Sequence, residues 1–197
     1  MVSTKEGGLE GKEDLTNILR IFEEARKAIP PSNWMKLKDL SNETLHSATI
    51  HQDTLNIITA VLVYALSKVL QRESYRNMPG WDKFYKTLLA KWDEAIKALK
   101  QKDAEKAIQI EGEIRQSLNK LDSDLGLYIK DIFRKAEINK AFKLYEHGLT
   151  AQATAELFGV SLWDLSTYIG QSSISEAHAS QTLPEKERIK HVEEFFK

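Results

Sequence analysis

The chain has 197 residues, enough for one large or two small domains with a buried core. A formal net charge of −1 provides no overall attraction to nucleic acid or acidic membranes, and the absence of cysteine excludes disulfides, thiol catalysis and zinc–thiolate sites. The chain has no N-terminal apolar signal core, and its longest apolar run is about half of the roughly 20 residues that span a membrane. We therefore expect a cytoplasmic protein that does not act at a membrane.

The first part of the chain predicts an N-terminal helical bundle over residues 12–121, preceded by a flexible tail over residues 1–11. Residues 12–29 carry apolar side chains on one stripe with charges opposite, which is typical of an amphipathic helix. Pro30 and Pro31 should end this helix, because proline cannot continue the backbone hydrogen bonding.

A connector over residues 32–40 is expected to lead into one long helix over residues 41–72. The second half of that helix, from residue 55 to residue 70, is apolar on more than one side. A helix with this pattern is normally surrounded by other helices or lies in a subunit interface. We therefore expect it at the centre of the bundle.

The cleanest amphipathic segment is residues 81–101, which follows a turn over residues 77–80. Asp103 is placed to cap a further helix. Beyond it, apolar residues recur at steps of four and three, which favours near-parallel packing against a partner helix and, in our interpretation, a homodimer. These residues are Ile114, Leu118, Leu121, Leu125, Tyr128 and Ile132. An alternative is that residues 122–124 end this helix and cap a new one.

Residues 122–170 are expected to form a small helix-turn-helix domain. Thr150 and Ser161 are placed to cap its last two helices, and Gly148 and Gly159 lie where the chain must reverse. The spacing of alanine, glycine and apolar residues resembles the helix-turn-helix of prokaryotic DNA-binding proteins. A polar linker over residues 171–183 and a C-terminal amphipathic docking helix over 184–197 follow, so the expected fold class is all-α.

The candidate binding residues lie on the exposed face of the second helix of this motif and on the helix before it. Arginine and lysine usually contact DNA phosphates and base edges, and Lys140 and Lys143 are the only two between residues 137 and 170. Trp163 and Leu162 are more typical of a protein contact. The complete set is Lys140, Lys143, Ser161, Leu162, Trp163, Asp164, Ser166, Thr167 and Gln171.

Residues 141–169 also resemble the core of small archaeal and bacterial antitoxin-type proteins. The resemblance rests on Leu144-Tyr145-Glu146-His147-Gly148, on the segment from Ala151 to Ser161, and on Trp163. It implies a part that binds DNA or dimerises, and a tail that wraps a toxin. The helix expected at 184–197 would correspond to that tail.

A weaker alternative is a metal-dependent helical enzyme that uses Glu43, His46 and Asp53. Glu43 and His46 have the i, i+3 spacing of di-iron four-helix bundles, but the chain has no second Glu-x-x-His pair. No glycine-rich phosphate loop occurs either, so we expect no cofactor.

Two functional hypotheses follow from these observations. The first is a non-enzymatic regulator, either a DNA-binding transcriptional regulator or an antitoxin-like protein. The second is an interaction or scaffold protein that binds a protein partner through the helix-turn-helix and the C-terminal helix. Both make the partner DNA or a protein, with a toxin as one candidate.

Overall fold

The computed structural model describes residues 7–51, 54–119 and 124–177. The described residues form eight α-helices and one short 3₁₀ helix, with no strands, which confirms the all-α fold class. In chain order these are α1 (Gly7–Ala28), α2 (Trp34–His51), α3 (Thr54–Gln71), the 3₁₀ helix η1 (Glu73–Asn77), α4 (Trp81–Lys100), α5 (Ala104–Asn119), α6 (Asp124–Glu146), α7 (Ala151–Phe158) and α8 (Leu162–Ala177).

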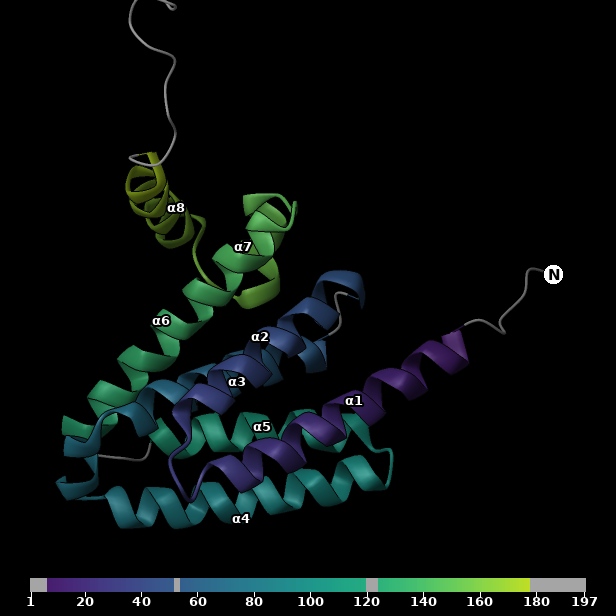
Figure 1. The fold of residues 1–197 in the computed structure, drawn as a ribbon, viewed down its shortest axis with the longest axis vertical. Coiled ribbons are helices and arrows are strands. Elements are labelled where there is room, and N and C mark those ends of the chain that lie inside the picture. Colours follow the sequence, from purple (N-terminus) through teal and green to yellow (C-terminus); the bar gives the residue numbers. More distant parts are fainter. Residues whose placement is uncertain (1–6, 52–53, 120–123, 178–197) are drawn as a thin grey trace, which may run out of the picture.

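The apolar helix α3 lies at the centre of the bundle, as its sequence predicts. It packs against α2, α5, α6 and α1, and nearly all of its side chains from Leu55 to Leu70 are buried. Figure 1 shows α1 and α4 along one side of the molecule and α6 running obliquely across it. Of the described helices, α3 is also the one whose length and apolar composition would suit a membrane span, and most of it is buried in protein.

The amphipathic helices α1 and α4 close the outer side of the bundle. Trp92 of α4 is completely buried, its indole N–H donates to the Phe22 carbonyl oxygen at 2.9 Å, and the two rings lie 4.7 Å apart. At the surface, Arg26 and Asp93 form an ion pair at 2.8 Å between the same helices. The predicted helix over 81–101 is confirmed almost to the residue.

The predicted single helix over 41–72 is wrong. The structure has two helices, α2 and α3, which pack extensively on each other, and α2 begins at Trp34 within the expected connector. A continuous helix of this length would be about 48 Å long and would carry its first half away from the core. Folding back buries Leu37, Leu40 and Leu45 of α2 instead.

Other boundaries also differ from those expected. Helix α1 begins at Gly7, within the segment predicted to be a tail, and α8 continues to Ala177, into the predicted linker. The apolar seam is divided between α5 and α6, in agreement with the alternative of a new helix near residues 122–124. Tyr128 is half exposed and stacks on Tyr75 at 5.8 Å. The C-terminal helix predicted over 184–197 lies outside the described residues.

Helix α6 joins the bundle to the helix-turn-helix. Its first half packs on α3 and α5, and its C-terminal half holds α7 and α8 at the end of the molecule farthest from α4 (Figure 1). Ala155 and Phe158 of α7 and Leu165 of α8 belong to the same hydrophobic cluster as the bundle residues. The helix-turn-helix therefore shares its core with the bundle.

The N-terminus of α5 provides a simple test of a predicted cap. The Asp103 carboxylate accepts a hydrogen bond from the Lys106 backbone N–H at 2.9 Å. Asp103→Ala should lower the free energy of unfolding by about 1 kcal/mol, as measured by urea denaturation. Glu105→Ala in the same helical turn removes an acid that makes no such bond, so an equal loss there would contradict the capping role.

Candidate functional site

The turn between α7 and α8 has the geometry that its sequence predicts. The Thr150 hydroxyl accepts from the Ala153 N–H at 3.2 Å and begins α7. Gly159 ends α7 with φ +63°, a left-handed conformation that favours glycine, and the Val160 N–H returns to the Ala155 carbonyl at 3.1 Å. The Ser161 hydroxyl then caps α8 by accepting from the Asp164 N–H at 3.0 Å. Every cap of the predicted motif is therefore in place.

The N-terminal part of α8 presents an apolar surface to solvent. Trp163 is 80% exposed and Leu162 is 43% exposed, whereas Leu165 turns inward and is fully buried. We call Leu162 and Trp163 the Trp163 surface. The polar candidates Ser166, Thr167 and Gln171 are also exposed on α8.

The charge around this surface is acidic rather than basic. The described side chains of α7 and α8 include the acids Glu156 and Asp164 but no lysine or arginine. Arg134 of α6 is the nearest cation with a defined contact, and its guanidinium pairs with both oxygens of Asp164 at 3.1 and 3.2 Å. The Ser161 hydroxyl and then Arg134 hold the pKa of Asp164 below its usual value. This carboxylate therefore stays ionised and occupies the neighbouring arginine.

The structure corrects the assignment of Lys140 to a DNA-contacting surface. Its side chain is only 1% exposed, its ammonium donates to the Asn42 side-chain carbonyl at 2.8 Å, and it lies 4.4 Å from the centre of the Tyr64 ring. Lys140 therefore links α6 to α2 and α3 and cannot reach a phosphate. Lys143 is exposed, and its ammonium pairs with Glu146 at 2.6 Å.

The two described residues suggested for a metal site, Glu43 and His46, contact other side chains. Glu43 forms an ion pair with Arg20 of α1, and the His46 ring lies 6.3 Å from the ring of His147. Asp53 lies outside the described residues. Across residues 7–51, 54–119 and 124–177, no group of three or more histidine, aspartate or glutamate side chains could hold a metal ion.

Two buried acids close to α7 are not among the site residues that the sequence predicts. Glu111 of α5 is 2% exposed and Glu137 of α6 is 8% exposed, and both line a cavity that α7 closes on one side. Glu111 precedes Gly112 in a helix whose apolar positions, Ile110 and Ile114, lie around it. An acid between apolar helix positions is the only signal that could have identified it.

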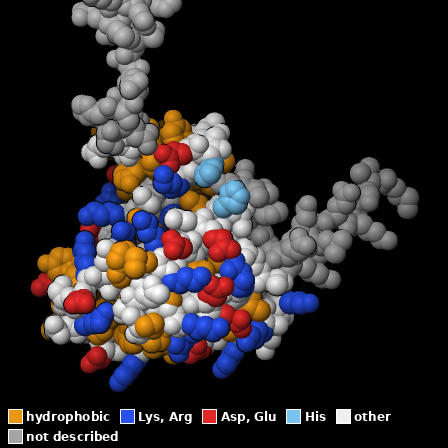
Figure 2. All heavy atoms as spheres, viewed as in Figure 1, with side chains coloured by type: hydrophobic (Ala, Val, Ile, Leu, Met, Phe, Trp, Pro, Cys, Tyr) orange, Lys and Arg blue, Asp and Glu red, His pale blue; other side chains and the backbone are white. Residues whose placement is uncertain are grey.

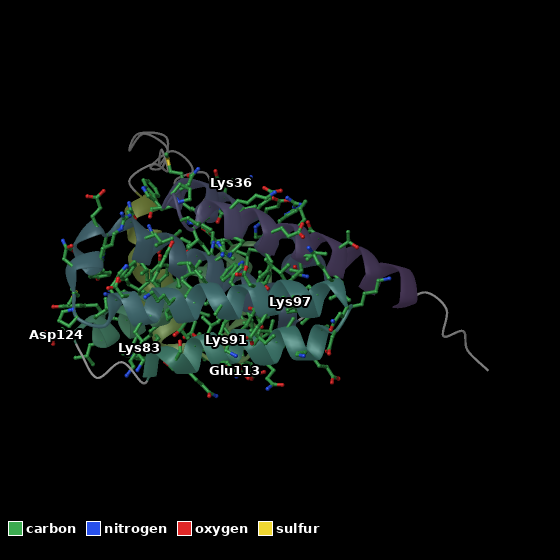
Figure 3. All side chains as sticks on the ribbon, turned by 90° about the horizontal axis from the view of Figure 1, so that it is seen from below. Lys36, Lys83, Lys91, Lys97, Glu113 and Asp124 are labelled. Carbon is green, nitrogen blue, oxygen red and sulfur yellow. The ribbon has the colours of Figure 1, made fainter. Side chains whose placement is uncertain are left out.

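A second hollow, of about 320 Å³, lies between α4 and α5. Lys91 of α4 pairs there with Glu113 of α5 at 2.9 Å, and Lys83 lies farther along the same groove (Figure 3). This hollow is open to solvent, and Lys91 and Glu113 are paired at its surface. Over the face drawn in Figure 2, basic and acidic side chains are intermixed and form no single basic patch.

No protein-family model, curated protein or solved structure matches the chain. The resemblance of residues 141–169 to antitoxin-type proteins, and the toxin that it implies as a partner, therefore stay predictions. The chemistry of the described residues carries the functional argument.

Proposed function

We propose that this chain is a non-enzymatic regulator that uses its helix-turn-helix to bind a protein partner. The observation that carries the proposal is the 80% exposure of Trp163, which stands beside the part-exposed Leu162 at the start of α8. Tryptophan is the residue type most enriched among the side chains that dominate protein interfaces. An exposed tryptophan on a helix that begins with a defined cap is a rigid anchor for such a contact.

The charge of α7 and α8 indicates what kind of partner would fit. Glu156 and Asp164, with no basic side chain among the described residues of these helices, suit a partner that offers an apolar pocket with basic side chains at its rim. The same charges oppose binding to DNA, whose affinity depends mainly on cations that neutralise phosphates. One such partner is a second copy of the chain, as the predicted homodimer would require.

DNA binding is the second candidate, and one observation favours it. The helix-turn-helix has complete caps, and Ser166, Thr167 and Gln171 are exposed on α8, where a recognition helix would face the major groove. Lys143 and the more distant Lys135 of α6 are exposed cations that could supply phosphate contacts.

A site-specific cross-linking experiment separates the two candidates. A photoreactive amino acid at position 163 should form a covalent adduct with a protein in the native cells, and mass spectrometry of the adduct identifies the partner. With the purified partner, Trp163→Ala should weaken binding by about 30-fold, since loss of a central tryptophan costs about 2 kcal/mol. Isothermal titration calorimetry measures this change.

Tyr128→Ala is the matched control, because Tyr128 is a half-exposed aromatic residue of α6 away from α8. It should leave the affinity unchanged. A DNA mobility-shift assay at low salt tests the alternative. A shift that persists in Trp163→Ala would favour DNA binding over protein binding if the double variant Lys135→Ala, Lys143→Ala abolishes it. This result would overturn the protein-binding proposal.

A further inference from the structure

A cavity of about 220 Å³, open to solvent on one side, lies where the bundle meets the helix-turn-helix, between α3, α5, α6 and α7. A dry apolar cavity of about 150 Å³ is large enough to bind benzene. This cavity therefore has room for a ring and a short polar substituent. Most of its walls are apolar and include Ile57, Val61, Leu62, Phe133, Leu157 and Phe158.

Glu111 gives this cavity a buried polar group whose hydrogen bonding is incomplete. One carboxyl oxygen, Oε1, accepts from the Thr59 hydroxyl at 3.0 Å. The other, Oε2, is buried and has no hydrogen-bond partner among the described residues, although Glu111 is only 2% exposed. Leaving a buried polar atom unpaired costs about 1–3 kcal/mol. In this conformation Oε2 is closed off from the cavity, so a molecule in the cavity recovers this cost only if the Glu111 carboxyl group turns to present Oε2 to it.

Glu137 adds a second carboxyl group to the same cavity. It is 8% exposed and forms an ion pair with Arg115, whose own side chain is 61% exposed and reaches Glu137 from the rim. Among the side chains that line the cavity, Arg115 is the only basic one. The solvated guanidinium of Arg115 is therefore paired with Glu137, and no described basic side chain of the lining pairs with Glu111.

We propose that this cavity binds a small primary amine whose hydrocarbon part has about six to eight carbon atoms. The ammonium group donates to Glu111 Oε2, and the hydrocarbon part fills the space between Val61, Leu62 and Phe158. The interaction of an ammonium with a carboxylate in an apolar site is roughly twice as strong as a neutral hydrogen bond. This site is separate from the Trp163 surface and goes beyond the proposed function.

The protonation of Glu111 agrees with this assignment. Burial raises the pKa of its carboxyl group to about 8, with the Thr59 hydroxyl acting in the opposite direction. At pH 7, which lies below this pKa, the Glu111 carboxyl group is therefore mostly neutral. A bound ammonium places a positive charge beside this group, so the carboxyl proton should be released on binding.

Benzylamine is a suitable probe, and benzyl alcohol and toluene are its neutral counterparts. In NMR titrations of the full chain at pH 7, benzylamine should shift the methyl signals of Ile57, Val61 and Leu62. The Glu111 side-chain carbonyl carbon should move towards its ionised position in the same titration. Benzylamine should bind about tenfold more tightly than benzyl alcohol, and Glu111→Gln should remove that difference.

Glu113→Gln is the matched control. Glu113 lies two residues after Glu111 on α5, but its carboxylate pairs with Lys91 in the hollow between α4 and α5. It should leave benzylamine binding unchanged. Equal affinities for benzylamine and benzyl alcohol would overturn the assignment to amines, and methyl shifts confined to other helices would overturn the site. Both of these outcomes are read in the wild-type protein, so they hold even if the Glu111 variant does not fold.

Discussion

Replacing Glu111 with glutamine should stabilise the protein strongly at alkaline pH and hardly at all in acid. The folded-state pKa of Glu111 is about 8, compared with 4.5 as its ordinary value, because the carboxyl group is buried. The folded protein therefore holds a proton between these pH values that the unfolded chain releases. Stability contributed by this group is complete below pH 4.5 and is lost as the pH rises through about 8. Glutamine keeps the shape of the neutral acid and does not titrate.

The size of this effect follows from the pKa difference. Each pH unit between 4.5 and about 8 is worth about 1.4 kcal/mol, so Glu111→Gln should exceed the wild type by about 5 kcal/mol in unfolding free energy at pH 9. Urea denaturation followed by tryptophan fluorescence at pH 5, 7 and 9 measures it. Glu113→Gln should show no such rise with pH, because the Lys91 ion pair lowers the pKa of Glu113 and keeps it ionised throughout this range. If the unfolding free energies of Glu111→Gln and the wild type differ by the same amount at pH 5, 7 and 9, Glu111 titrates at its ordinary pKa.

The sequence was sufficient to predict those elements whose signals are local. The stripe of α4, the caps at Asp103, Thr150 and Ser161, and the left-handed Gly159 depend only on residues within a few positions of each other. The turn and the helix ends of the helix-turn-helix are defined by such signals. Its fold could therefore be read with little knowledge of the rest of the chain.

The features that were missed depend on distant parts of the chain. The separation of α2 from α3 follows from the burial of Leu40 and Leu45 against α3, and no proline or glycine near residue 52 marks it. The sequence predicts Lys140 to be a surface cation, because nothing in its own helix shows that its ammonium contacts Asn42 of α2 and Tyr64 of α3. The cavity beside Glu111 is formed by four helices, so no single stretch of the sequence predicts it.

The exposure of the Trp163 surface could be predicted in part. The motif places residues 162 and 163 at the start of the second helix, and Leu165 inward, as the structure confirms for Leu165. In α7, Leu157 is 38% exposed, whereas the next residue, Phe158, is buried. Because α7 packs on the bundle as well as on α8, its inward face is set by both neighbours.

Lys140→Met should stabilise the protein in neutral and acidic solution. Burial lowers the pKa of the Lys140 ammonium to about 7 from 10.5, and Lys143, Lys38 and Lys68 act in the same direction. Between these values the unfolded chain binds the proton more strongly, so the stability of the wild type rises with pH through this interval, by up to about 1.4 kcal/mol per pH unit. The cost of burying the charge is therefore complete below about pH 7.

Methionine fills the same space without a charge, so the variant should be more stable than the wild type at pH 6. The net gain should be about 3 kcal/mol, because the variant also loses the hydrogen bond to Asn42 and the contact with the Tyr64 ring. The difference between variant and wild type should decrease from pH 7 to pH 10.5, measured by urea denaturation across that range. Lys143→Met is the control on the same helix, since Lys143 is exposed and should show no such trend. A variant that is less stable than the wild type at pH 6 would mean that the Asn42 and Tyr64 contacts outweigh the cost of burying the ammonium.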